Sequence, residues 1–295
     1  MVRDFLKFPT ITMKYEASKD LSAPEFKRLF GVQRETFNQM STLMREAAKN
    51  KGKGGVKAKL SPENQVLVTL QYWREYRTYF HISKDWEVSE STVCRVVKKV
   101  ENVMIKSDKF HLAGKKLLWS ENAPTVVAVD VTESKVERPQ RRQKGFYSGK
   151  KKHHALKAQL LVDLTNYSII CTAYGHGKQH DFHLFKASKI HLNKQTQVLA
   201  DKGYQGLQKL HSNTQIPIKK PKSGALSAND KRFNRLLARQ RIVIEHVNRR
   251  LKIFKILSER YRNRRRRFGL RCNLIAAIYN FELSLSASNR SEAVS

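Results

Sequence analysis

Long apolar runs are absent from this 295-residue chain. No stretch reaches the length of a membrane span, and no basic amphipathic helix with a Trp-rich face points to a membrane surface. The N-terminus has no continuous apolar core, so we expect no signal peptide. We therefore expect no membrane partner, and we find no internal repeat.

Cysteine is scarce. Cys94, Cys171 and Cys272 lie far apart and form no CxxC pair. This spacing excludes a disulfide framework and disfavours a structural zinc site. We expect small buried side chains in a reducing compartment, which favours a cytoplasmic location.

Acidic residues are few compared with basic ones. The chain holds 58 Lys and Arg against 25 Asp and Glu, a net charge of +33. Self-repulsion on this scale predicts a polyanionic partner, and nucleic acid fits better than a membrane. The 40% apolar fraction argues against general disorder, and the length allows two domains.

The first part of the chain predicts helices. Residues 1–48 carry apolar side chains at helical spacing. The expected buried face consists of Phe26, Leu29, Phe30, Phe37, Met40 and Leu43. Residues 49–60 are rich in Lys and Gly and predict a basic linker.

Residues 61–118 predict a DNA-binding helix-turn-helix domain. Ser61 and Pro62 mark a helix start, a short helix follows near 79–86, and Ser89 or Ser91 caps the next helix. The side chains expected to face DNA are Thr92, Arg95, Lys98 and Lys99. The alternative is a three-helix bundle without a DNA-binding role.

Residues 119–288 predict a mixed α/β domain, followed by a tail at 289–295. Three β-branched runs near 124–133, 155–166 and 167–175 precede alternating helices and strands. A helix is expected over roughly 228–257. This order favours a meander of three strands, with later strands entering by crossovers.

Two carboxylates follow apolar strands. Asp130 ends one predicted strand and Asp201 ends another. If these strands are parallel neighbours, both acids lie at one sheet edge, where oxygen ligands suit Mg²⁺. A strand-end cap or a salt bridge is the alternative. Asp163 competes with Asp130 for the first position, and spacing does not exclude Glu133.

A third carboxylate, Glu245, lies within a basic helix. At 100° per residue Val243, Val247, Leu251 and Phe254 share one stripe. Glu245 lies opposite with the phosphate-binding groups Arg241, Asn248, Arg249 and Lys252. A solvated helix surface would have the same pattern.

The segment 135–154 holds eight Lys or Arg. Its expected DNA contacts are Arg141, Arg142, Lys144, Lys150, Lys151 and Lys152. Phe146 and Tyr147 would stack on splayed bases, and a solvated hairpin is the alternative. The Arg-rich run 260–271 is expected to follow phosphates too.

Two smaller motifs remain. His176, His180, Asp181 and His183 form a cluster, for which a helix cap at Asp181 is favoured over zinc. The glycines of "KGYQG" directly follow Asp201 and would allow the backbone to approach a phosphate, or form an ordinary turn.

The chain resembles bacterial insertion-sequence transposases of the DDE superfamily, within the insertion-sequence-five family. The resemblance is carried by "VSESTVCRVV", "VDVTE", "HDFHLF" and "LADKGYQG". Arg241, Glu245 and Lys252 also fit the spacing of the Tyr-x2-Arg-x3-Glu-x6-Lys signature, with Ala238 in place of the Tyr.

This resemblance implies an RNase-H-like fold, with Asp130, Asp201 and Glu245 as catalytic metal ligands. The cofactor would be Mg²⁺ or Mn²⁺ as two ions, with no small-molecule cofactor. The enzyme would bind the terminal inverted repeats, cut them and join the 3′ ends to double-stranded target DNA, as a homo-oligomer on the bacterial nucleoid. The alternatives are an inactive DNA-binding derivative and a plain magnesium-dependent nuclease.

Overall fold

The computed structural model describes residues 14–50, 58–221 and 223–292. Most of the predicted linker 49–60 and the end of the predicted tail 289–295 lie outside these residues. The chain divides into two compact units, Met1–Ser107 and Asp108–Ser295. The segment after Ser107, including Leu118, packs in the core of the second unit.

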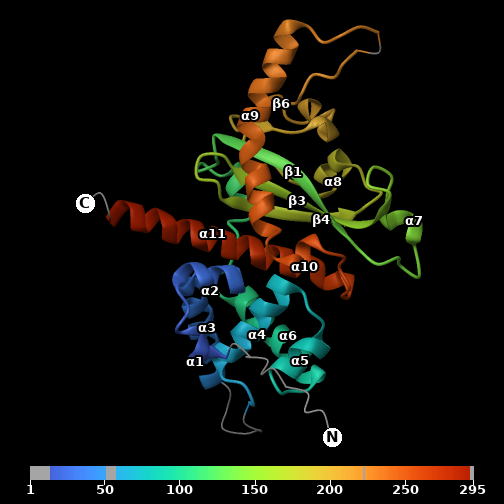
Figure 1. Cartoon of the computed structure of the whole chain (residues 1–295). Coiled ribbons are helices and arrows are strands. Elements are labelled where there is room, and N and C mark those ends of the chain that lie inside the picture. The colour runs from blue at the N-terminus through green and yellow to red at the C-terminus, as the bar shows by residue number, and fades with distance from the viewer. Residues whose placement is uncertain (1–13, 51–57, 222, 293–295) are drawn as a thin grey trace, which may run out of the picture. The chain divides into compact units, whose positions relative to one another are not determined.

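The first unit is all-α over its described residues (Figure 1). Its helices are α1 (Tyr15–Ser18), α2 (Ala23–Phe30), α3 (Arg34–Lys49), α4 (Pro62–Glu75), α5 (Tyr79–Asp85) and α6 (Glu90–Lys106). Ser22 and Glu25 form a capping box at α2, and Ser61 and Ser89 accept backbone N–H groups at the starts of α4 and α6. The predicted short helix, turn and second helix are present as α5 and α6.

The predicted apolar face of residues 1–48 needs two corrections. Phe26, Phe30, Phe37 and Met40 are buried as expected, but Leu29 is 37% exposed and Leu43 is only partly buried. The eight-residue helix α2 buries a narrow stripe through Phe26 and Phe30, one turn apart, and Leu29 lies at its rim.

The second unit is built on a mixed sheet, with six strands in the described part of the chain. The strands are β1 (Val126–Lys135), β2 (Tyr147–Ser148), β3 (His153–Asp163), β4 (Ile169–His176), β5 (Gln197–Leu199) and β6 (Thr214–Gln215). β1, β3 and β4 pair antiparallel as a meander, whereas β5 pairs parallel with β1 and β6 parallel with β5. The predicted RNase-H-like mixed sheet flanked by helices is confirmed.

Helices and short turns surround this sheet (Figure 1). They are η1 (Lys115–Trp119), α7 (Gln143–Phe146), α8 (Asp181–Ala187), η2 (Lys202–Tyr204), η3 (Leu207–Lys209), α9 (Ala228–Leu251), α10 (Lys255–Ser258), η4 (Arg265–Arg267) and α11 (Phe268–Glu292). α9 packs on β1 and α11 packs on β4, while α8 contacts β3 and β4.

The helix expected over 228–257 ends earlier than predicted, because α9 stops at Leu251 and α10 begins at Lys255. The break lets the following segment run along the end of β1. There the Ser134 hydroxyl donates to the Leu257 carbonyl and the Tyr261 N–H donates to the Lys135 carbonyl.

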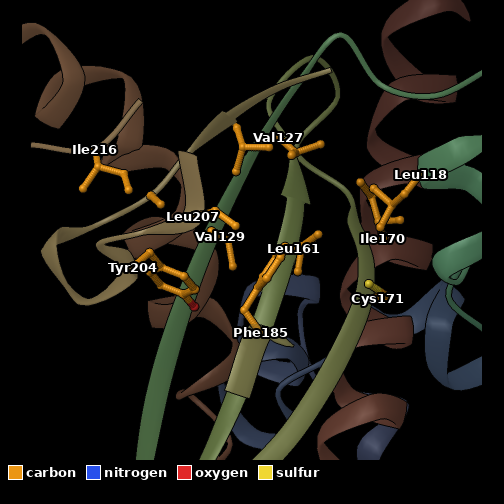
Figure 2. Close-up of a cluster of buried hydrophobic side chains, with 12 residues drawn as sticks. Leu118, Val127, Val129, Leu161, Ile170, Cys171, Phe185, Tyr204, Leu207 and Ile216 are labelled. Atoms are coloured by element: carbon orange, nitrogen blue, oxygen red, sulfur yellow. The ribbon is translucent and has the colours of Figure 1, made fainter. Parts of the chain in front are cut away.

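The core of the second unit lies on one face of β1 and β3 (Figure 2). Val127 and Val129 point into it with Leu161 of β3 and Phe185 of α8. Because side chains alternate along a strand, Asp130 faces the opposite side, where α9 packs. Cys171 and Cys272 are buried free thiols, as predicted, whereas Cys94 is a free thiol that is only partly buried.

Candidate active site

The three predicted acids line one pocket of about 570 Å³ in the second unit. Asp130 comes from β1, Asp201 follows β5 and Glu245 lies on α9. The complete lining is Asp130, Val131, Thr132, Glu133, Lys150, Lys151, His153, Asp181, Asp201, Glu245, Asn248, Arg249 and Lys252. Side chains from both faces of the sheet therefore meet at the point where β5 ends.

The position of Asp130 corrects one expectation, because β1 does not end there. β1 continues to Lys135, held by antiparallel pairing with β3 up to Ala155. On its other side, pairing with β5 ends at Ala128 and Leu199. Asp130 and Asp201 each lie two residues beyond that last parallel pair, so the predicted proximity comes from the end of β5.

Helix α9 holds the Asp130 carboxylate. The Asn248 amide donates to Oδ2 at 2.9 Å, and the Arg241 guanidinium lies 3.7 Å from Oδ1. Burial raises the pKa of Asp130 to about 6, opposed by Arg241 and reinforced by the negative charges of Asp201 and Asp181. Burial is the largest cause of this shift, and Arg241 offsets only part of it.

Asp201 begins the turn η2. Its Oδ1 accepts the Gly203 N–H at 2.8 Å. A Cβ at Gly203 would lie 2.8 Å from Asp181 Oδ2 and 3.0 Å from Asp201 Oδ1, so a side chain there would displace a carboxylate. Glycine at this position lets the backbone approach the carboxylates of Asp181 and Asp201 closely. From the "KGYQG" motif alone we expect a close approach to a phosphate or an ordinary turn.

Glu245 lies on the exposed side of α9, as predicted. The buried stripe differs from the expected one. It runs through Leu237, Ile244, Val247, Asn248 and Leu251, and includes Asn248 because its amide reaches Asp130. The Arg241 side chain is 12% exposed and faces Asp130, whereas Arg249 and Lys252 are exposed and line the pocket.

Lys157 is a buried cation beside the pocket whose position the sequence pattern did not predict. This side chain is 8% exposed, and its ammonium lies 2.8 Å from Asp181 Oδ1 and 3.7 Å from Glu133 Oε1. It also donates to the Gln179 carbonyl at 2.7 Å. The available signal was a lysine inside the apolar strand "ALKAQLLVD", because a buried cation requires a buried partner.

The expected capping role of Asp181 is wrong. His180 is the N-cap residue of α8, and Asp181 is its first helical residue. Its carboxylate instead pairs with Lys157 and lines the pocket. Asp163 is not among the residues that line the pocket, and its Oδ1 accepts the Thr165 N–H in the turn after β3.

Several buried polar atoms beside the acids have no hydrogen-bond partner. They are Thr132 Oγ1, Glu133 Oε2, His153 Nδ1, Asn248 Oδ1 and Arg241 Nε. Buried polar groups without a partner indicate that the pocket binds a ligand or an ion. Among the described residues, no group of three or more His, Cys, Asp or Glu is close enough to hold a metal ion. The oxygen donors and the raised pKa of Asp130 nevertheless fit a hard divalent cation in this pocket.

Predicted DNA-binding residues fall into several places. Lys150 and Lys151 line the acidic pocket, Lys144 lines a second pocket, and Arg141 lines a third beside the Arg-rich run. Arg142 and Lys152 are exposed in the same segment.

The expected base stacking by Phe146 and the expected phosphate contact by Arg271 are both corrected. Phe146 is 7% exposed, because its ring packs 4.3 Å from His176 and under Arg265, so it is not available for base stacking. Tyr147 is 42% exposed. Arg271 of the Arg-rich run is 1% exposed and donates to the Tyr261 hydroxyl, so it does not follow phosphates.

In the first unit, the predicted DNA-facing residues differ in their surroundings. Lys98 and Arg95 are exposed, and the Arg95 guanidinium also contacts Ser91. Thr92 joins the cap of α6 through Ser89. The Lys99 ammonium donates to Gln65 Oε1 at 2.9 Å.

Comparisons with known proteins agree with this architecture. Residues 129–280 match the family of DDE superfamily endonucleases, and residues 58–109 match the helix-turn-helix of DDE superfamily endonucleases. The chain is 54% identical over 276 residues to a protein of Microchaete diplosiphon named probable transposase for insertion sequence element IS702, covering 93% of this chain and 100% of that protein.

No solved structure matches the chain. Within the described residues, no helix is both long and apolar enough to cross a membrane. The first family match spans the sheet and α9, which together supply the pocket with its three predicted acids. The chain therefore belongs to the DDE superfamily of endonucleases and carries the helix-turn-helix of that superfamily.

Proposed function

We propose that this protein is a DNA transposase of an insertion sequence, within the insertion-sequence-five family. It binds the terminal inverted repeats of its element, cuts the ends and joins the 3′ ends to target DNA. The observation that carries the proposal is that Asp130, Asp201 and Glu245, remote in sequence, line one pocket. The similarity to the protein named for element IS702 supports the same activity.

The proposed metal ligands are the three acids, for two Mg²⁺ or Mn²⁺ ions. Bound ions of this kind would activate water for hydrolysis and stabilise the leaving oxygen of a phosphodiester. Asn248 and Arg241 orient Asp130, and the Gly203 N–H orients Asp201.

The cations at the pocket would hold the DNA backbone. Lys150 and Lys151 enter from the β2–β3 hairpin, and Arg249 and Lys252 from α9 and its end. Lysine and arginine bind phosphate strongly, and their placement around the acids would align a strand across the pocket. α6 would read the repeat sequence through Thr92, Arg95, Lys98 and Lys99. In the second unit, Arg241 of α9 would bind DNA at the acidic pocket, beside Asp130. Because both ends must be joined together, the proposed working form is a homo-oligomer on cytoplasmic bacterial DNA.

The test uses the full chain with labelled element ends, a target plasmid and Mg²⁺. Joined products support a transposase. Cut ends without joining indicate a plain nuclease, and binding without cutting indicates a non-catalytic DNA-binding protein. Asp130→Asn, Asp201→Asn and Glu245→Gln should each abolish cutting while DNA binding persists. Asp230→Asn changes another acid of α9, outside the pocket, and should retain activity. Full activity in Glu245→Gln would contradict the proposed third ligand.

A further inference from the structure

A second pocket of about 660 Å³ lies beside the same hairpin that borders the acidic pocket. Its lining is mostly carbon surface and consists of Arg138, Gln143, Lys144, Tyr147, Gly149, His154 and Lys178. The lining includes three cationic side chains and no carboxylate. An apolar hollow with a cationic rim matches a flat aromatic group attached to phosphates.

The hairpin separates the two pockets. Tyr147 pairs with His154, and Ser148 pairs with His153, across β2 and β3. His153 lines the acidic pocket and His154 lines this one, because adjacent strand residues point to opposite faces. At the tip, Gly149 lines this pocket and Lys150 lines the acidic one. Because the two pockets share this hairpin, a DNA strand held at the acids would reach the second pocket by passing around the hairpin tip.

Tyr147 supplies the stacking surface. The residue is 42% exposed, and its ring lies edge-on to the His154 ring, with centroids 5.6 Å apart and planes at 72°. The edge-on contact with His154 restricts the ring, and the exposure of Tyr147 leaves part of its surface accessible to a ligand. Aromatic faces stack on any nucleobase, which makes such a contact tolerant of sequence.

The wall behind Tyr147 is fixed by backbone contacts. The Lys178 N–H donates to the Gly145 carbonyl at 3.2 Å, and the Gly177 N–H donates to the Ala155 carbonyl at 2.9 Å. A Cβ at Gly177 would lie 2.3 Å from the Phe146 carbonyl oxygen, so the two segments touch. This packing, with Phe146 buried beneath it, forms the pocket before any ligand binds.

We propose that this pocket binds one unpaired nucleobase of the DNA strand that enters the acidic pocket, stacked on Tyr147 with its phosphates on Lys144, Lys178 and Arg138. The proposal rests on the proposed function, because it requires DNA at the acidic pocket. It assigns Tyr147 the role of holding the strand beside the scissile bond.

The test measures binding of fluorescein-labelled DNA in EDTA, so that no strand is cut. The probes are a fully paired duplex and a forked duplex of the same sequence with three unpaired nucleotides. The ratio of the dissociation constants for the two probes removes the contribution of general electrostatic attraction, because both probes carry the same sequence. Wild-type protein should bind the fork more tightly than the duplex. Tyr147→Ala should lower this ratio of affinities about tenfold, which is the expected contribution of one base–aromatic stack.

Two variants serve as controls. Tyr147→Phe keeps the ring and should retain the preference. Tyr167→Ala removes a ring of similar exposure, 47%, in the turn after β3 and should also retain it. A 2-aminopurine at the first unpaired position should be quenched by wild type and stay bright with Tyr147→Ala.

Equal preference for the fork in wild type and Tyr147→Ala would overturn the inference while leaving the proposed function intact. Absence of any DNA binding by the wild type would overturn both.

Discussion

The carboxyl group of Asp130 shows how burial and charge act on one residue. Its pKa rises from the usual 3.8 to about 6 because the group is buried and faces Asp201 and Asp181. A folded-state pKa above the unfolded value means that the folded protein binds the proton more tightly. The associated stability is present below pH 3.8 and is lost as pH rises through about 6.

Asp130→Asn should therefore remove this pH dependence. Between pH 4.5 and pH 8, the unfolding free energy of the variant should rise by roughly 2 kcal/mol relative to wild type, from the size of the pKa shift. Urea denaturation in EDTA at both pH values measures the difference. Parallel pH profiles for the two proteins would show that Asp130 titrates normally.

Lys157 is the second residue whose surroundings allow a prediction. Its ammonium lies within 4 Å of the carboxylates of both Asp181 and Glu133. Lys157→Met should lower the unfolding free energy by about 3 kcal/mol, because it leaves buried carboxylates without their partner. Lys157→Arg keeps the charge and should cost less.

Urea denaturation of the double variant Lys157→Met with Asp181→Asn checks the cause. Removing one of the uncompensated charges should restore part of the lost stability. If the loss of unfolding free energy in the double variant equals the sum of the losses in the two single variants, the Lys157–Asp181 contact contributes nothing to stability.

At the scale of elements, two helices carry most of the proposed function. α9 combines three tasks on one helix, since Ile244 and Val247 pack inward, Asn248 and Arg241 hold Asp130, and Glu245 faces the pocket. Because these positions are fixed by the 3.6-residue repeat, packing of the helix also sets the orientation of its acid.

α6 offers a matched pair of lysines for testing DNA contact. Lys98 is exposed, whereas the neighbouring Lys99 ammonium is bonded to Gln65. Lys98→Ala should reduce the slope of log affinity against log salt by about 1, the loss of one phosphate contact. Lys99→Ala should change the slope less. Fluorescence anisotropy at several salt concentrations measures the slopes of both variants. Identical slopes for wild type and Lys98→Ala would show that Lys98 does not contact DNA.

At the scale of the whole molecule, the net charge of +33 dominates. Repulsion among these charges opposes the compact state, and salt or a polyanion screens it. The melting temperature should therefore rise with added NaCl up to about 0.5 M. The reason is that the screening length is about 10 Å at 0.1 M and shortens further as salt is added. Duplex DNA should raise it further at low salt. Differential scanning fluorimetry measures both effects, and a melting temperature independent of salt would contradict the expectation.

The sequence by itself determined the elements and the chemistry of this protein. Apolar periodicity and caps such as Ser61 and Ser89 located the helices, because these signals act within a few residues. Strand and helix contexts made Asp130, Asp201 and Glu245 candidates, and the resemblance to DDE transposases selected them as a set. All three line one pocket.

Only the tertiary structure decided which distant groups face one another. It paired Lys157 with Asp181 and Glu133, buried Phe146, and ended β5 beside Asp130 while β1 continued. None of these follows from local sequence, since each depends on strand register and on which face of the sheet a side chain occupies. The physical reason is that burial and pairing of charge arise between segments far apart in the chain, whereas periodicity and capping are properties of each segment alone.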